Sequence, residues 1–279
     1  MPIDAKLTRL TFQRLDRELR KLAQKAAPDN VHKFRINSRR IEALLSEVVV
    51  KRHRNDEKLL ELLTCLRKKA GRIRDLDVQI AALRALKFPQ ANGHKSQMID
   101  ALVDEREKRE RKLAKAFDRD TTGEIRKRLK RAANKLDISP DADALQLTLR
   151  KLRELGNGDA PLTEKNLHQY RIVGKRARYI AELANGNPGA ERTVEQLKRM
   201  QDVIGDWHDW LKLTEKAEEL LGGVRDSALV AMLRNVTQAK FRQSVDAVAE
   251  IRSVLKIRPA EPMHSQKVPA REAAQAAVA

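Results

Sequence analysis

Residues 31–41 read VHKFRINSRRI and residues 167–177 read LHQYRIVGKRA, which are two copies of one short pattern. At a shift of 136 positions the copies share a histidine, an aromatic residue, an arginine, an isoleucine and two further cations. The matched pairs are His32 and His168, Phe34 and Tyr170, Arg35 and Arg171, Ile36 and Ile172, Arg39 and Lys175, and Arg40 and Arg176. We call each copy a cassette. An internal repeat of this kind predicts two related structural units in one chain.

Each cassette separates into two faces when it is placed on an α-helix at about 100° per residue. One face is apolar and is expected to contact a core, through Phe34 and Ile41 in the first copy and Tyr170 and Ala177 in the second. The other face is a cationic stripe. It consists of His32, Arg35 and Arg39 within about 60°, and of His168, Arg171, Lys175 and Arg178 within about 80°. A single charged face usually serves solubility, but its recurrence at the same offsets favours a binding role.

The composition favours helices and a polyanionic partner. Aromatic residues make up only 3% of the 279 residues and charged residues 35%, with few Gly and Pro, which is typical of helical bundles. The formal net charge of +19 attracts nucleic acid, anionic membranes or polyphosphates. The chain has no apolar run near the roughly 18 residues of a spanning helix and no apolar signal segment at its start. We therefore expect a cytoplasmic protein that does not insert into membranes. Its single cysteine, Cys65, is expected to pack among leucines in a core.

Breaks in the apolar periodicity divide the chain into a series of expected helices. They cover residues 3–26, 31–54, 56–70, 71–86, 95–118, 124–136, a short segment between 141 and 156, and then 163–184, 190–204, 206–221 and 225–256. Asp29 or Asn30 is expected to cap the first cassette helix, and Thr163 the second. The polar residues after Pro259 predict a disordered tail.

The repeat continues beyond the cassettes. Gly71-Arg72-Ile73-Arg74-Asp75 matches Gly205-Asp206-Trp207-His208-Asp209, and each glycine follows its cassette histidine by 37–39 residues. We therefore expect an all-α domain of two bundles related by a pseudo-two-fold axis, with the two stripes facing a shared basic groove. The expected divisions are residues 1–140, 141–257 and a tail at 258–279. Asp75 and Asp209 are expected to cap the helix that follows or to orient a stripe arginine, and Trp207 and Trp210 to lie in a core.

With these elements the chain resembles the CHAD family, the conserved histidine α-helical domain. The resemblance lies in the two His-x-x-Arg-x-x-x-(Arg/Lys)-Arg helices, in Arg178-Tyr179, in the run from Ala70 to Val78, and in Leu197-Lys198-Arg199-Met200-Gln201 followed by Ile204-Gly205. It covers about residues 5–255. The chain departs from the family pattern at Glu42, where another arginine is common, and at His208, which replaces an arginine.

The resemblance implies two four-helix bundles around a basic central channel that binds inorganic polyphosphate without catalysis, cofactor or metal, often at polyphosphate granules. Carried onto this chain, the polyphosphate-binding residues are His32, Arg35, Arg39, Arg40, Arg74, His168, Arg171, Lys175, Arg176, Arg178 and Lys198. Arginine suits this ligand because its planar group donates two hydrogen bonds to one phosphate. Arginine and lysine are expected to stay charged. The two cassette histidines are expected either to take up a proton on binding or only to bond a neighbouring carbonyl or carboxylate.

Two alternatives remain open. A net charge of +19 would also attract RNA or DNA, although nucleic-acid readers use exposed aromatic or groove-entering side chains, and aromatic residues are few here. The other is a metal-dependent phosphohydrolase, with His208, Asp209, Asp206 and one of His32 or His168 as ligands. No His-Glu-x-x-His pattern, paired cysteines or glycine-rich phosphate loop supports the enzyme.

Overall fold

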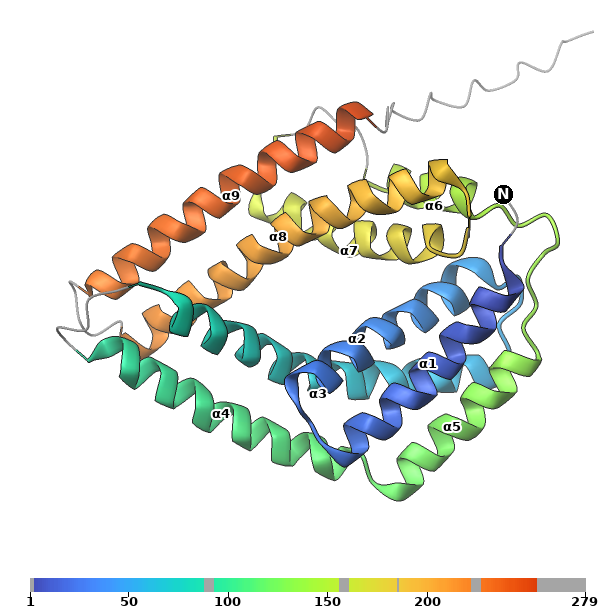
Figure 1. Cartoon of the computed structure of the whole chain (residues 1–279), viewed down its shortest axis with the longest axis horizontal. Coiled ribbons are helices and arrows are strands. Elements are labelled where there is room, and N and C mark those ends of the chain that lie inside the picture. Colours follow the sequence, from blue (N-terminus) through green and yellow to red (C-terminus); the bar gives the residue numbers. More distant parts are fainter. Residues whose placement is uncertain (1–2, 88–92, 156–160, 185, 222–226, 255–279) are drawn as a thin grey trace, which may run out of the picture.

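The computed structural model describes residues 3–87, 93–155, 161–184, 186–221 and 227–254. Within these ranges the chain forms nine α-helices and one π-helical turn, without a strand (Figure 1). The elements are α1 (Ala5–Gln24), α2 (Pro28–Ala43), η1 (Leu44–Val48), α3 (Arg54–Ala85), α4 (His94–Ala116), α5 (Arg119–Asn134), α6 (Ala144–Arg153), α7 (Glu164–Ala181), α8 (Pro188–Leu221) and α9 (Ala228–Val254). The all-α prediction is confirmed. The tail predicted at 258–279 lies outside the described residues.

Two expected breaks are absent, because α3 and α8 run through Gly71 and Gly205 as helices of 32 and 34 residues. An interior glycine costs a helix about 0.5–1 kcal/mol. That cost is small beside the burial of apolar side chains on both sides of each glycine, such as Ala70 and Ile73 in α3 and Ile204 and Trp207 in α8. The prediction that Asp75 and Asp209 cap a new helix is therefore wrong, since no helix begins after either residue.

Three large apolar cores and a small alanine cluster of Ala144, Ala184 and Ala190 hold the described helices together. The N-terminal core joins α1, α2, η1, α3 and α5, and the edge-on contact of Phe34 with Phe117 lies in it at 5.6 Å between ring centroids. The C-terminal core joins α6, α7, α8 and α9 around Trp207, which is 1% exposed. The arm core joins the end of α3 and the start of α4 to the end of α8 and the start of α9.

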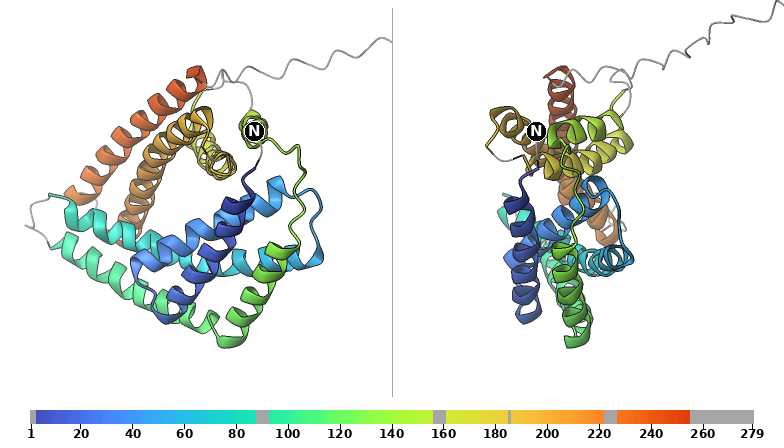
Figure 2. Two further views of the ribbon diagram at one scale, coloured as in Figure 1. Left: turned by 45° about the vertical axis from the view of Figure 1, so that its right-hand side comes forward. Right: turned by 90° about the vertical axis from the view of Figure 1, so that its right-hand side faces the viewer.

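The arm core determines the outline of the molecule. The α3–α4 and α8–α9 pairs reach to one side and meet there, while the remaining helices lie on the other side (Figure 1). Seen edge-on, the helices form a narrow slab (Figure 2). Ile180 and Leu183, at the end of α7, join the N-terminal core and so connect the two parts of the chain on the other side. The division near residue 140 and the pseudo-two-fold relation stay predictions.

Local details confirm one expected cap and correct two expectations. The Thr163 hydroxyl accepts a hydrogen bond from the Asn166 amide, at 3.3 Å, so the predicted cap of α7 is confirmed. Neither Asp29 nor Asn30 caps α2, because Pro28 occupies the first turn and its fixed φ starts the helix. Cys65 is exposed rather than buried, because its position on α3 faces away from the leucines on either side.

None of the helices in the described part of the chain is both long and apolar enough to span a membrane.

Candidate functional site

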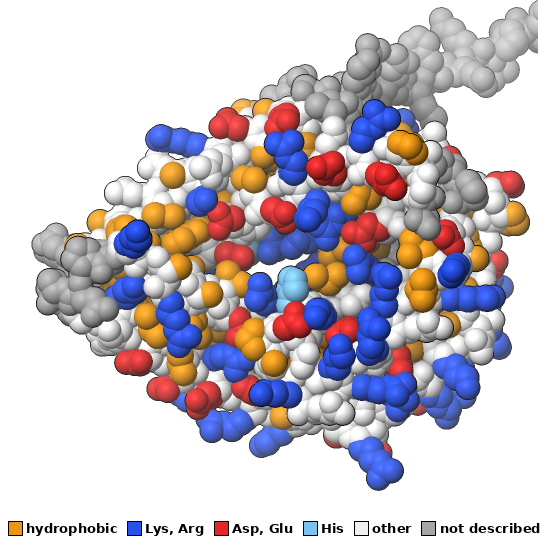
Figure 3. Space-filling view, viewed as in Figure 1, with side chains coloured by type: hydrophobic (Ala, Val, Ile, Leu, Met, Phe, Trp, Pro, Cys, Tyr) orange, Lys and Arg blue, Asp and Glu red, His pale blue; other side chains and the backbone are white. Residues whose placement is uncertain are grey.

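The two cationic stripes meet where α2 packs against α7. Arg35 and Arg39 of α2 both lower the pKa of Lys175 on α7, and Arg171 of α7 lowers the pKa of Arg35. The charges of the two cassettes therefore act on one another at short range. In the space-filling view a hollow lies near the middle of the face, bordered by Lys and Arg side chains and a histidine (Figure 3). We use the name central hollow for the region where Arg35, Arg39, Arg171 and Lys175 influence one another between α2 and α7.

Arg35 is held over the backbone of α3. Its Nη1 donates a hydrogen bond to the Arg67 carbonyl at 3.2 Å, and a Cβ added to Gly71 would lie 2.2 Å from the same nitrogen. Glycine at position 71 therefore makes room for the guanidinium group. Burial lowers the pKa of Arg35 to about 10, although the nearby Asp75 carboxylate opposes this shift. A buried guanidinium with its remaining N–H groups unpaired is prepared to bind an anion.

Lys175 and Arg171 are the two stripe cations of α7 that form no close ion pair with a described residue. Neither makes a hydrogen bond or a close ion pair with any residue that the structure describes, and the Nε of Arg171 is buried without an acceptor. Burial and the charges of Arg171, Arg39 and Arg35 lower the pKa of Lys175 to about 7. The expectation that every lysine stays charged is wrong here, because residue type does not reveal burial among like charges.

Asp209 is the main opposite charge near Arg171, but it neutralises that arginine incompletely. Burial raises the pKa of the Asp209 carboxyl, although Arg171 acts against this shift. The charge of Asp75 adds to the raised pKa of Asp209, whereas Arg171, Lys175 and Arg74 oppose it. The local balance of charge in the central hollow therefore stays positive.

Three histidines line the same region. The rings of His168 and His208 lie 5.7 Å apart, and burial together with Arg171 and His168 lowers the pKa of His208 to about 3. Burial is also the main cause that lowers the pKa of His32 and His168, with Arg74 and Arg35 adding to it at His32. His32 and His168 remain accessible to solvent, and an anion bound beside any of the three rings would raise its pKa again.

Four other predicted residues lie at the edge or outside of the central hollow. Arg40 pairs with Glu182 at 2.9 Å, and Arg178 pairs with the same carboxylate at 3.3 Å. Arg176 lies 4.0 Å from Glu42 and 3.8 Å from Glu47. Lys198 is exposed on α8, two turns before Gly205 and on the same helix face.

Arg39 and Arg74 are half-buried, and neither has an ion pair with a described residue. With His32, Arg35, His168, Arg171 and Lys175 they form the group that the structure brings together. The predicted set omits three members of this region: Arg67, His208 and Asp209. Arg67 precedes Gly71 by one helical turn, and the other two belong to the repeated glycine element, so their spacing could have identified them.

The metal ligands suggested by the sequence, His208, Asp209 and Asp206 with His32 or His168, do not form a metal-binding group among the described residues. Within the described ranges there is no group of three or more His, Cys, Asp or Glu side chains with the proximity of metal ligands. Asp206 pairs instead with Lys240 at 2.8 Å.

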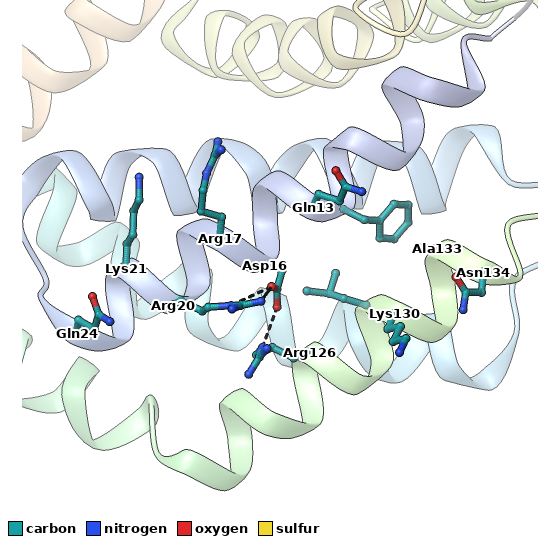
Figure 4. A pocket seen from close by; sticks show the side chains of 12 residues that line it. Gln13, Asp16, Arg17, Arg20, Lys21, Gln24, Arg126, Lys130, Ala133 and Asn134 are labelled. Carbon is teal, nitrogen blue, oxygen red and sulfur yellow. Dashed lines mark hydrogen bonds and ion pairs between the residues drawn. The ribbon is translucent and has the colours of Figure 1, made fainter.

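A separate groove of about 740 Å³ lies between α1 and α5, away from the central hollow. Asp16 lies between Arg20 and Arg126 in this groove and accepts hydrogen bonds from both (Figure 4). Its other cations, Arg17, Lys21 and Lys130, are exposed. Exposed charges keep most of their hydration, so this groove has less to gain from an anion than the buried cations of the central hollow.

The comparisons with known proteins agree with this architecture. The family model of the CHAD domain matches residues 6–216, which is shorter than the resemblance at 5–255. The crystal structure of the CHAD domain from the plant Ricinus communis is similar at a TM-score of 0.65 and 20% identity, over 88% of each chain. PptA from Streptomyces chartreusis is similar at a TM-score of 0.64 and 16% identity, over 92% of this chain and 99% of the other. No curated protein matches. The family model covers well over half of the sequence, and the protein therefore belongs to the CHAD domain family.

Proposed function

We propose that the protein binds inorganic polyphosphate in the central hollow and does not change it chemically. Polyphosphate is a flexible chain of phosphate groups with no base or sugar to recognise. A site for it needs densely placed cations and little else, and arginine is the best single donor because its planar group binds one phosphate with two hydrogen bonds. The resemblance of the cassettes to those of polyphosphate-binding CHAD domains points to the same ligand.

The observation that carries the proposal is that three half-buried cations form no close ion pair with any described residue. These are Arg35, Arg171 and Lys175, and burial lowers the pKa of all three. A buried charge without a partner is costly to a folded protein. Phosphate oxygens would supply both the missing charge and the missing acceptors. Arg39, Arg74, His32 and His168 adjoin this trio and are proposed as further contacts, with Lys198 reached only by a longer chain. Arg40, Arg176 and Arg178, also expected from the sequence, are engaged by carboxylates instead.

The same geometry disfavours a nucleic-acid reader. The aromatic rings nearest the stripes, Phe34, Tyr170 and Tyr179, are at most 5% exposed and serve the cores. They offer no surface on which a base could stack. We also propose that the protein acts in the cytoplasm, at polyphosphate granules, as the family resemblance implies.

The proposal predicts that a double change at the buried arginines is far more harmful than a double change at exposed cations. Arg35→Ala with Arg171→Ala removes two charge-assisted hydrogen-bonding groups that contribute roughly 1.5–3 kcal/mol each, so long-chain polyphosphate should bind about a hundredfold more weakly or worse. Lys127→Ala with Arg131→Ala removes the same formal charge from exposed positions on α5. Titration calorimetry on both variants compares them, and equal losses would show diffuse attraction in place of a site.

Competition separates polyphosphate from nucleic acid as the preferred ligand. Fluorescent polyphosphate bound to the wild-type protein is displaced with unlabelled polyphosphate or with single-stranded RNA, at equal phosphate concentration. Displacement by polyphosphate at the lower concentration supports the proposal. Displacement by RNA at an equal or lower concentration contradicts it.

A further inference from the structure

The two equivalent arginines of the repeat make reciprocal contacts across the cassettes. Arg40 of α2 pairs with Glu182 at 2.9 Å, and Glu182 is the residue that ends α7. Arg176 of α7 reaches back to Glu42, in the last turn of α2, at 4.0 Å. Since each contact joins the end of one cassette helix to the other helix, the two C-terminal ends lie together.

Glu42 also neutralises a buried cation that adjoins Arg35. Its Oε2 lies 3.0 Å from Nη2 of Arg67, whose side chain is 13% exposed. Glu42 is the main opposite charge that raises the pKa of Arg67 against its burial. Glu42 follows Arg35 by seven residues and Arg39 by three, so it lies on the face of the cationic stripe. The stripe of α2 therefore ends in a carboxylate.

Glu182 is a second carboxylate at the end of the other cassette helix, four residues after Arg178, which is the residue that matches Glu42 in the repeat. It follows Lys175 by seven residues and lies on the same helix face. Besides Arg40 it pairs with Arg178, at 3.3 Å, and its side chain is only 24% exposed. Glu42 and Glu182 thus pair with Arg40, Arg67, Arg176 and Arg178, and Glu47 is a further carboxylate at Arg176. Arg35, Arg171 and Lys175, which form no close ion pair with a described residue, precede these two carboxylates along α2 and α7.

We propose that Glu42 and Glu182 close one end of the polyanion site and so limit how many phosphate groups contact the protein closely. A chain bound at Arg35, Arg171 and Lys175 would be repelled by both carboxylates when it extends toward the C-terminal ends of α2 and α7. The C-terminal end of α7 also carries the partial negative charge of the helix dipole, which acts in the same direction. The four arginines held there contribute to joining the cassettes and not to the ligand. This inference rests on the proposed function and adds a determinant of chain length to it.

The test compares a short and a long ligand on matched glutamate variants. Glu42→Gln keeps the shape of the side chain but frees Arg67, while Arg176 keeps Glu47 at 3.8 Å, and Glu182→Gln frees Arg40 and Arg178. Each should raise the affinity for long-chain polyphosphate about tenfold, as one added charge-assisted contact would. The affinity for tripolyphosphate, which is too short to extend past the occupied end, should change less than about threefold on the same reasoning. Glu61→Gln is the control, since it removes one exposed carboxylate that pairs with Lys58.

The outcomes separate this inference from the proposed function. Calorimetry gives both affinities for each variant, and thermal unfolding shows that each variant is folded; Glu182→Gln provides the test if Glu42→Gln is unfolded. A selective gain for the long chain supports the inference. An equal gain for both ligands, or a gain no larger than that of Glu61→Gln, overturns it while polyphosphate binding stands. If the wild-type protein binds neither ligand, the proposed function fails and this inference with it.

Discussion

Lys175 lies among Arg171, Arg39 and Arg35, and no described residue forms an ion pair with it. Burial and these like charges lower the pKa of its ammonium group to about 7. Protonation of the Lys175 amine therefore destabilises the folded, ligand-free protein. A bound polyanion would raise the pKa again, so proton and ligand should favour each other near neutral pH. The pKa values of His32, His168 and His208 are also lowered in the free protein, so a bound polyanion would act on them in the same direction.

Lys175→Met is expected to stabilise the free protein and to weaken its binding of polyphosphate. The pKa is lower in the folded chain than the ordinary value of 10.5, so the unfolded chain binds more protons between about pH 7 and 10. Wild-type stability at this site therefore rises with pH across that interval, and the penalty is complete below about pH 7. The gain from methionine should be about 1–3 kcal/mol at pH 7 and should shrink toward pH 9.5.

Thermal unfolding of Lys175→Met at pH 7 and pH 9.5 measures this gain, and calorimetry measures the loss of binding. Lys127→Met on the exposed face of α5 is the control and should change neither quantity much. A gain in stability that is the same at both pH values would mean that the Lys175 ammonium is not strained, and the charge argument for the central hollow would lose its support.

At the scale of elements, Gly71 and Gly205 occupy matching positions of the repeat but differ in what surrounds them. A Cβ at Gly71 would lie 2.2 Å from Arg35, whereas a Cβ at Gly205 would meet nothing within 4 Å. Both residues lie inside long helices, where alanine is favoured over glycine by about 0.5–1 kcal/mol. The same substitution should therefore have different consequences at the two positions.

Gly205→Ala is expected to raise the free energy of unfolding by about 0.5–1 kcal/mol and to leave polyphosphate affinity unchanged. Gly71→Ala should displace the Arg35 guanidinium from its place over α3 and weaken binding about tenfold, which corresponds to roughly one hydrogen bond to a charged group. Thermal unfolding and calorimetry on the two variants provide the comparison. If both variants bind as the wild type does, Gly71 does not position Arg35.

The sequence predicted the helical class, most helix positions and the two faces of each cassette, because these follow from apolar spacing. It did not predict that α3 and α8 continue through Gly71 and Gly205, since packing on both sides of a glycine is a tertiary property. For the candidate site, the cassettes identified Arg35, Arg171 and Lys175 by residue type. The ion pairs of Arg40 with Glu182 and of Arg67 with Glu42 could not be predicted from the sequence, because each joins segments that only the tertiary fold brings together.

At the scale of the whole molecule, the charge of +19 and the arrangement of the helices act against each other. The end of α7 and the arm core connect the two parts of the chain, while the cations of both cassettes face one another between these connections. Repulsion among like charges destabilises a compact state, and it is strongest where water screens it least. The free protein should therefore be less stable at low ionic strength than its apolar cores alone would make it.

Salt is expected to have opposite effects on the free and the bound protein. Added NaCl screens the repulsion among the cations, and it also weakens ion pairs such as Lys58–Glu61 and Arg234–Glu218. Exposed pairs contribute only about 0–1 kcal/mol each, so at this net charge the relief of repulsion should prevail and the Tm of the free protein should rise between low and moderate salt.

Polyphosphate binding should weaken steeply over the same range of salt. Binding releases the counter-ions of the polyanion, and this release becomes less favourable as the salt concentration rises. The stabilisation by a fixed concentration of polyphosphate, which grows with the ratio of ligand to Kd, should therefore shrink. Thermal scans with and without polyphosphate over a salt series measure both trends. A Tm of the free protein that falls with salt would show that ion pairs outweigh the repulsion in this fold, and a ligand-induced shift independent of salt would contradict an electrostatic site.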